Sequence, residues 1–355
     1  MSFGEATHER SGVLCAGSIV VDVGKVIDRY PSQELLAVIE DVTLSTGGPA
    51  VNLAVDLHRL GAGFPLAIAG VIGDDAHADF MLDALRTNEI DASGIRRTKR
   101  AATSFTDAMV VRDGGSRTFF HHPGANAEFG PDDVPLATST ARILHMGAPG
   151  LHRAMDAARA DSDGEPTNGW PQVFAAAQAL GMRTNLELVS LAPDELRRLA
   201  GPCLPHLDYL VINEVEATAL AEVDLDAVGA TSVTGSGGAP NWPALEDVAR
   251  RLIDRGVARL VAVHFPAGCV AAAPGGQVWR HGSVNLPRTE IVSSTGAGDA
   301  FASGVIHGLH DGWPVEECLR AGVSAAAACL RSAHTSDGVL PLAECLAMAE
   351  EFGYR

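Results

Sequence analysis

The chain has 355 residues, of which 46% are hydrophobic, and a formal net charge of -18 at pH 7. This length and composition can fill one large folded core, whereas the acidity argues against sequence-independent binding of nucleic acid or anionic membranes, both of which need clustered Lys and Arg. The six cysteines form no CxxC pair and no apolar run approaches the roughly 20 residues of a membrane span, so we expect a protein of the reducing cytoplasm without disulfides, zinc knuckles or membrane helices.

Apolar runs typical of buried strands recur along the chain, with amphipathic segments between them. In the segment 51–60, Leu53, Leu57 and Leu60 share one helical face, and Gly61 closes the helix. This alternation of strands and helices predicts a parallel sheet covered by helices. The apolar runs are 13–21, 66–72, 141–146, 209–212 and 259–263.

Two regions interrupt this alternation, residues 25–43 and 102–122. The second region reads as two strands joined at Asp113, Gly114 and Gly115. Both regions predict a β excursion from the main domain. A flap that covers a cleft and an ordinary edge hairpin are both compatible with the pattern.

Two segments in the first sixth of the chain place polar groups at expected element ends. Asp22 follows the first apolar run, at the edge where open α/β sheets bind ligands, so it is either a ligand for two hydroxyl groups or a solvated acid. A glycine-rich turn at 45–48 feeds a helix with Asn52 in its first turn. An amide that donates and accepts suits a sugar hydroxyl, and a surface Asn near a helix start is the alternative.

The segment 211–216 ends an apolar strand with the pattern Asn213-x-x-Glu216. Oxygen ligands at the carboxyl end of a strand suit Mg²⁺ held mostly through water, with nucleotide phosphates completing its shell. The alternative is an acidic helix start.

The segment 294–301, STGAGDAF, places two glycines at the start of an expected helix and an acid directly after them. Unpaired amides and the positive end of a helix dipole form an anion site there. An acid beside an anion site is electrostatically unfavourable unless it accepts the proton of an attacking hydroxyl during phosphoryl transfer, although Asp299 is also a candidate helix cap. Phe301 stands where a dinucleotide fingerprint needs its third glycine, and the Gly-Lys-Ser/Thr ending of a P-loop is missing.

In this order and at these distances, the four segments resemble the ribokinase-like (PfkB) carbohydrate kinase family, and the match spans nearly the whole chain. The family's first signature resembles Gly47-Gly48 with Asn52. Its second and more specific signature resembles Thr295-Gly296-Ala297-Gly298-Asp299. The segments 70–75, 124–126 and 213–216 agree with intermediate landmarks of the family.

The resemblance implies a fold and an activity. The fold is a doubly wound, mainly parallel α/β domain over residues 12–355, with a small β-sheet lid from about residues 23–45 and 102–124 and a flexible tail at 1–11. The activity is ATP-dependent phosphorylation of a sugar or sugar-acid hydroxyl. By resemblance, Asp299 is the general base, Gly296, Ala297 and Gly298 form the anion hole, Asp22, Gly48 and Asn52 bind the sugar, Asn213 and Glu216 hold Mg²⁺ largely through water and contact the nucleotide, and Thr295 and Gly268 lie near the nucleotide.

The chain departs from the family pattern at three places. Ser293 replaces a carboxylate that many members carry, which leaves a requirement for K⁺ open. The segment 263–268 replaces the usual nucleotide loop, so its adenine contacts and the nucleotide preference do not carry over. Pro49 follows the glycine pair where ribokinases have Lys, and this resembles fructokinases or ketodeoxygluconate kinases more closely.

Two other functions remain open at this point, a nucleoside kinase on the same scaffold and a catalytically silent ligand sensor. The expected partners are a small sugar and ATP, with neither nucleic acid nor membrane. Lids with exposed apolar strands often pair, so a homodimer through the lid is compatible with the resemblance.

Overall fold

The computed structural model describes residues 10–112, 117–161, 164–229 and 240–355. Most of the expected tail at 1–11 and the expected turn at Asp113, Gly114 and Gly115 lie outside the described residues. Among the described residues, no helix combines the length and apolar character needed to cross a bilayer.

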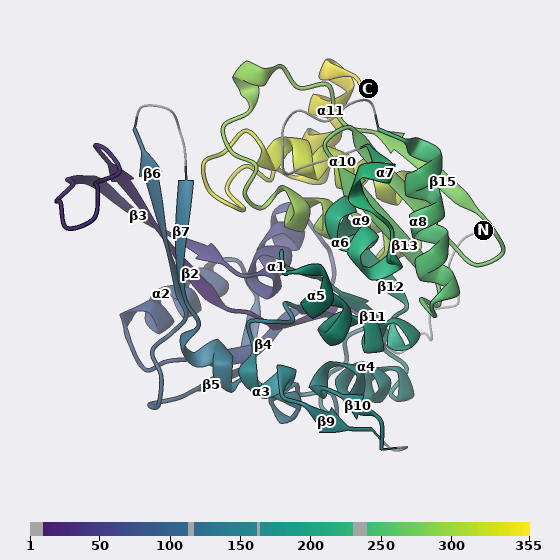
Figure 1. The fold of residues 1–355 in the computed structure, drawn as a ribbon, viewed down its shortest axis with the longest axis horizontal. Coiled ribbons are helices and arrows are strands. Elements are labelled where there is room, and N and C mark those ends of the chain that lie inside the picture. Colours follow the sequence, from purple (N-terminus) through teal and green to yellow (C-terminus); the bar gives the residue numbers. More distant parts are fainter. Residues whose placement is uncertain (1–9, 113–116, 162–163, 230–239) are drawn as a thin grey trace.

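A large, mainly parallel sheet forms the centre of the described chain (Figure 1). Neighbouring strands from β13 to β5 run parallel, and only β14 and β15 are added antiparallel. In spatial order the strands are β15 (Val278–Gly282), β14 (Gly268–Ala272), β13 (Leu260–Phe265), β12 (Tyr209–Asn213), β11 (Arg183–Leu186), β8 (Ile143–Gly147), β1 (Val13–Gly17), β4 (Leu66–Ile72) and β5 (Asp91–Arg97).

Helices cover both faces of this sheet, as the alternation of strands and helices predicts. Successive residues of β1 point to opposite cores: Val13 and Cys15 pack into one and Leu14 and Ala16 into the other. The first core is covered by α1 (Pro49–Arg59), α2 (Ala76–Thr87), α9 (Ala297–Asp311) and α10 (Val315–Cys329), and the second by α4 (Gly169–Ala179), α5 (Pro193–Ala200), α6 (Glu214–Ala221) and α8 (Trp242–Asp254).

Shorter elements complete the domain. They are α3 (Arg153–Asp156), α7 (Leu225–Val228), α11 (Leu342–Phe352), the pair β9 (Arg159–Ala160) and β10 (Pro166–Thr167), and the 3₁₀ turns η1 (Gly124–Glu128), η2 (Pro131–Asp133), η3 (Gly201–His206) and η4 (Arg288–Glu290). The doubly wound α/β class expected from the sequence is therefore confirmed.

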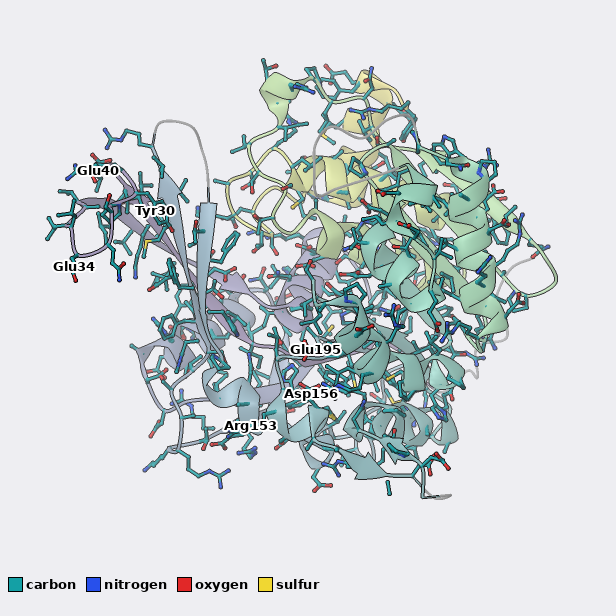
Figure 2. All side chains as sticks on the ribbon, in the orientation of Figure 1. Tyr30, Glu34, Glu40, Arg153, Asp156 and Glu195 are labelled. Atoms are coloured by element: carbon teal, nitrogen blue, oxygen red, sulfur yellow. The ribbon has the colours of Figure 1, made fainter. Side chains whose placement is uncertain are left out.

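A second, smaller sheet projects from one side of the large sheet (Figure 1). Its strands, in spatial order, are β3 (Ile39–Gly47), β2 (Val20–Ile27), β6 (Phe105–Val111) and β7 (Arg117–His122). Tyr30, Glu34 and Glu40 lie at its far end, away from the helices of the main domain (Figure 2). The β excursions read from the sequence therefore form one common sheet.

One expected strand is wrong. The apolar run 13–21 is divided between β1, which ends at Gly17 in the large sheet, and β2, which begins at Val20 in the small sheet. Hydrophobicity continues through the break because Ser18 and Ile19 are themselves buried where the two sheets meet. This change of sheet carries the chain directly from a central strand to Asp22.

Candidate active site

Four of the expected site segments meet at the carboxyl-terminal edge of the large sheet. Asn213 ends β12, and Asp22 lies in β2, three residues beyond the break that follows β1. The helices α1 and α9 bring Asn52 and Asp299 to the same place, where their side chains form a hydrogen bond. Ligands of open α/β sheets bind at this edge, so the fold gathers groups that are far apart in the sequence.

The start of α9 has the backbone geometry that an anion site needs. Gly296 is the N-cap, with φ of 83°, and a Cβ atom there would lie 2.5 Å from the carbonyl oxygen of Thr335, so only glycine fits. The amide of Ala297 donates to Ser294 at 3.3 Å, a long hydrogen bond. In the described part of the chain, no backbone or side-chain acceptor engages the amides of Gly298 and Asp299, which therefore face outward at the positive end of the helix.

The carboxyl group of Asp299 is tightly held. The Nδ2 atom of Asn52 donates to its Oδ2 at 2.6 Å, and the charge of the Glu187 carboxyl group acts on it. Burial, followed by the negative charge of Glu187, raises the pKa of Asp299 well above its usual range. The residue as a whole is half-buried and keeps some access to solvent.

Asn52 is not a surface residue, which was the alternative interpretation of its sequence position. It is 4% exposed, and its Oδ1 accepts from the hydroxyl of Thr335 at 3.5 Å while its amide nitrogen donates to Asp299. The apolar stripe of Leu53, Leu57 and Leu60 is therefore not the only buried face of α1.

Asp22 faces the same space as Asp299. Burial, and then the negative charge of Asp299, raise the pKa of Asp22 to about 7, while a hydrogen bond from Thr106 opposes the shift. The turn that precedes α1 lies against it: a Cβ atom on Gly47 would be 2.3 Å from a carboxylate oxygen of Asp22. Gly48 has φ of 90°, and a Cβ atom there would lie 2.4 Å from the carbonyl oxygen of Ser18.

Asn213 and Glu216 form a reciprocal capping box at the start of α6. The amide of Glu216 donates to Oδ1 of Asn213 at 2.9 Å, and the amide of Asn213 donates to Oε2 of Glu216 at 3.1 Å. This segment is thus an acidic helix start. The capping box occupies the side-chain oxygen of Asn213 and one carboxylate oxygen of Glu216. Burial raises the pKa of Glu216 to about 7, and the charge of Asp299 adds to the shift.

The residues fit Mg²⁺ held through water better than Mg²⁺ ligated directly. The second oxygen of the Glu216 carboxylate is left to accept from metal-bound water, and the mutual repulsion of the nearby carboxylates favours a cation. Among the described residues, no three His, Cys, Asp or Glu side chains converge as a metal site would require.

The remaining predicted residues lie around this centre. Thr295 directly precedes the N-cap of α9, and Gly268 opens β14 after the turn that replaces the usual nucleotide loop. His264, in that replaced segment, packs against the anion site: a Cβ atom on Gly298 would be 3.3 Å from its Cε1, and its ring centroid is 4.9 Å from that of Phe301.

Ser293 supplies a hydroxyl where the resembling family often has a carboxylate, and its Oγ accepts from the amide of Thr295 at 3.1 Å. That position provides no charged ligand for K⁺.

Sequence reasoning missed Glu187 and His145. Glu187 directly follows β11 (Arg183–Leu186), in which three of the four residues are polar, so that the segment does not read as an apolar strand. His145 lies inside β8, completely buried, with its Nε2 atom 3.0 Å from Oε2 of Glu187. The available signal was the position of this acid at the end of a short strand, β11, which lies beside β8 in the sheet.

Comparisons with known proteins show which proteins this chain is similar to. The 5-dehydro-2-deoxygluconokinase of Shouchella clausii (strain KSM-K16) is 24% identical over 96% of this chain and 95% of its own length. A protein of Arabidopsis thaliana named "Probable fructokinase-7" is 28% identical over 93% of this chain and 88% of its own length. The structure of Arabidopsis thaliana ribokinase complexed with ribose and ATP superposes with a TM-score of 0.73 and 21% identity, covering 96% of this chain and 99% of that one.

A family model described as "pfkB family carbohydrate kinase" matches residues 10–342. This match covers both family signatures and every strand of the two sheets. The chain is therefore a carbohydrate kinase and belongs to the pfkB family.

Proposed function

We propose that this sugar kinase transfers the γ-phosphoryl group of ATP to a hydroxyl group of a sugar or sugar acid, with Asp299 as the general base. The observation that carries the proposal is the place of Asp299 in the first turn of α9, where the amides of Gly298 and Asp299 have no acceptor among the described residues. A phosphoryl group on those amides and a hydroxyl on that carboxylate would be neighbours, as in-line transfer requires.

Each residue of the site has a separate proposed role in the transfer. The carboxylate of Asp299 accepts the hydroxyl proton, the freed electron pair of the oxygen forms the new O–P bond, and the bond from the γ-phosphorus to ADP breaks. In the turn Gly296, Ala297 and Gly298, the amide of Ala297 donates to Ser294, and the amides of Gly298 and Asp299 stabilise charge on the phosphoryl oxygens. When bound, Mg²⁺ would neutralise phosphate charge, with Asn213 and Glu216 orienting its waters.

The sugar is proposed to be held by Asp22, Asn52 and the turn at Gly48. Asp22 and Asn52 project into the space next to Asp299, and the turn at Gly48 brings the backbone close to them. A carboxylate and an amide together can accept from and donate to neighbouring hydroxyl groups. Asn52 also orients Asp299, so that it links substrate binding to the base.

The small sheet is proposed to act as the lid. Asp22 lies on one face of it, in register with Ser45 of β3 and Thr106 of β6, so this face adjoins the site. A movement of this sheet towards the large domain would exclude water from the transferring phosphoryl group.

The opposite face of the small sheet is proposed to form a homodimer. Leu44, Val23, Asp107 and Phe120 follow one another across the strands, so they share the face away from Asp22. Leu44 and Phe120 are 46% and 55% exposed, and Val42 on the same face is 55% exposed. Exposed apolar side chains on a sheet face are typical of an interface.

A reducing location is proposed from the cysteines. All six are free and buried, and burial raises the pKa of each thiol. No described pair depends on oxidation, which suits the cytoplasm.

A coupled assay of ADP release tests the function, with ATP as donor and a panel of ketoses, aldoses, sugar acids and nucleosides as acceptors. We expect turnover with a sugar or sugar acid, because the site offers a carboxylate and an amide to adjacent hydroxyls. Turnover with nucleosides alone would replace the substrate assignment, and the absence of turnover with every acceptor would contradict the kinase activity proposed at this site.

A further inference from the structure

His264 is adjacent to two parts of the proposed site that come from different elements. It lies near the end of β13 and pairs in register with Asn213, the last residue of β12. Its ring also reaches the start of α9, where a Cβ atom on Gly298 would lie 3.3 Å from Cε1 and 3.5 Å from Nε2. The edge of the ring that carries Nε2 therefore faces the proposed anion site.

Packing against the core holds this ring in place. Its centroid lies 4.9 Å from that of Phe301, and the two rings are tilted by 44°. Phe301 is 2% exposed and belongs to the core beneath α9, so it is a firm support. His264 itself keeps some access to solvent, as a residue that contacts a ligand must.

The ring nitrogens of His264 have no protein partner. Among the described residues, no hydrogen bond or ion pair engages either of them. Other histidines of the chain differ: Nε2 of His152 lies 3.0 Å from the hydroxyl of Ser18, and Nε2 of His310 accepts from the amide of Gly12 at 2.8 Å. A ring without a partner, beside amides without an acceptor, suits an oxygen acceptor from outside the protein.

The charge of the ring decides how it can bind such an acceptor. Burial lowers the pKa of His264 to about 4, so the ring is neutral at physiological pH, with one N–H donor. The titratable groups on the elements around it are Asp299 of α9, Glu216 of α6 and Cys269, which pairs with His264 from β14. A neutral ring forms no ion pair with these acids and acts on phosphate as a hydrogen-bond donor.

We propose that His264 is a catalytic residue whose Nε2–H donates a hydrogen bond to an oxygen of the transferring phosphoryl group. The inference rests on the proposed function, which puts that group on the amides of Gly298 and Asp299. His264 belongs to the segment 263–268, which departs from the family's nucleotide loop, so this contact is a feature of this chain and is not implied by the resemblance.

The ring would act on the charge of the transition state. While the bond from the γ-phosphorus to ADP breaks and the bond to the sugar oxygen forms, negative charge is spread over the oxygens of the transferring group. A donor that is already in position stabilises this charge without reorganisation. His264 keeps its proton throughout, so Asp299 remains the group that accepts the hydroxyl proton.

The kinetic test compares wild type, His264→Phe and His264→Gln. Phenylalanine keeps a ring to pack on Phe301 but has no donor, so kcat should fall about 10- to 100-fold while the sugar KM stays nearly unchanged. Glutamine restores an N–H donor at a similar reach, so its kcat should exceed that of His264→Phe by about fivefold or more. A merely structural role predicts the opposite order, because phenylalanine preserves the packing better.

His206→Phe is the matched control. His206 ends η3 directly before β12, at the opposite edge of the sheet, and should keep a wild-type kcat. A wild-type kcat in His264→Phe, or a kcat of His264→Gln no higher than that of His264→Phe, would overturn the proposal. Asp299→Asn separates this failure from failure of the proposed function, because near-normal turnover of Asp299→Asn contradicts the base and not the role of His264.

A second measurement needs no turnover. In wild type labelled with ¹⁵N-histidine, the ring signal that is missing from the spectrum of His264→Gln belongs to His264. The non-hydrolysable ATP analogue AMP-PNP, added with Mg²⁺, should shift this signal, whereas ADP, which lacks the γ-phosphate, should shift it much less. An equal shift with both nucleotides, or none with AMP-PNP, would show that His264 does not contact the γ-phosphoryl group.

Discussion

The position of the Asp22 carboxylate depends on the lack of a side chain at Gly47. A methyl group on Gly47 would lie 2.3 Å from one carboxylate oxygen of Asp22 and 2.9 Å from the other, closer than side-chain atoms can approach. The carboxylate would have to rotate away from the position in which it faces Asp299. The proposed binding of the sugar by Asp22 therefore depends on the geometry of this turn.

Gly47→Ala should raise the sugar KM about tenfold or more, because a misplaced carboxylate loses a charge-assisted hydrogen bond to the substrate. The nucleotide KM should change little, since the proposed anion site lies on α9. Steady-state kinetics measures both. Gly63→Ala is the matched control, because nothing lies within 4 Å of a Cβ atom at Gly63. Equal sugar KM values for the two variants would show that Asp22 does not bind the sugar from this position.

The small sheet is the element whose two faces have different proposed roles, with Asp22 on one and an exposed apolar surface on the other. Leu44→Asp places a charge on the apolar face without touching the row of Asp22, Ser45 and Thr106. Light scattering after gel filtration should give a dimer for wild type and a monomer for Leu44→Asp, because an unpaired charge in an apolar interface costs several kcal/mol, roughly.

Leu180→Asp is the control for this experiment. Leu180 is 43% exposed and caps the end of α4 in the main domain, outside the small sheet. The Leu180→Asp variant should remain a dimer. A monomeric wild type would contradict the proposed dimer. A dimer that survives Leu44→Asp would place the subunit contact on another surface.

The sequence predicts those elements whose hydrophobic pattern is unambiguous. The strand at 66–72 and the helix that starts near Gly298 agree with β4 and α9. The pattern fails where burial and polarity do not coincide. Asn52 and Glu187 are buried polar groups whose partners, Asp299 and His145, are distant in sequence, and no local periodicity reports such pairs.

At the scale of the whole molecule, the site concentrates acids whose charged forms are unfavourable. The pKa values of Asp22, Glu187 and Glu216 are each raised to about 7, chiefly by burial. A raised folded pKa means that these groups stabilise the fold at low pH and that this stabilisation is lost as pH rises through 7. Buried His145 and His264, with pKa values lowered to about 4, act in the opposite direction only below the ordinary histidine range.

These acids should therefore lower the free energy of unfolding as the pH rises from about 4, where the unfolded carboxyl groups ionise, to about 7, where the folded ones do. Asp56 contributes to this fall: burial raises its pKa well above the usual range and the charge of Asp299 adds to the shift, while Ser336 and Arg59 oppose it. Asp56→Asn cannot ionise, so it should be more stable than wild type at pH about 8, by about 1 to 3 kcal/mol, and similar to wild type at pH about 5.

Urea unfolding at the two pH values measures this difference. Asp83→Asn, at an exposed acid of α2, is the control and should behave as wild type at both. If Asp56→Asn lost stability equally at both pH values, the buried carboxylate would be a structural hydrogen-bonding group and not a source of unfavourable charge.

The central claim is that the carboxylate of Asp299 removes the proton from the attacking hydroxyl. The most direct measurement is the single-turnover rate of phosphoryl transfer from γ-labelled ATP in Asp299→Asn, at saturating concentrations of a sugar that the wild type phosphorylates. The account predicts a rate at least ~100-fold below wild type with both ligands still bound, since the amide keeps the shape and the contact with Asn52 but cannot accept a proton. A rate close to that of wild type would contradict it.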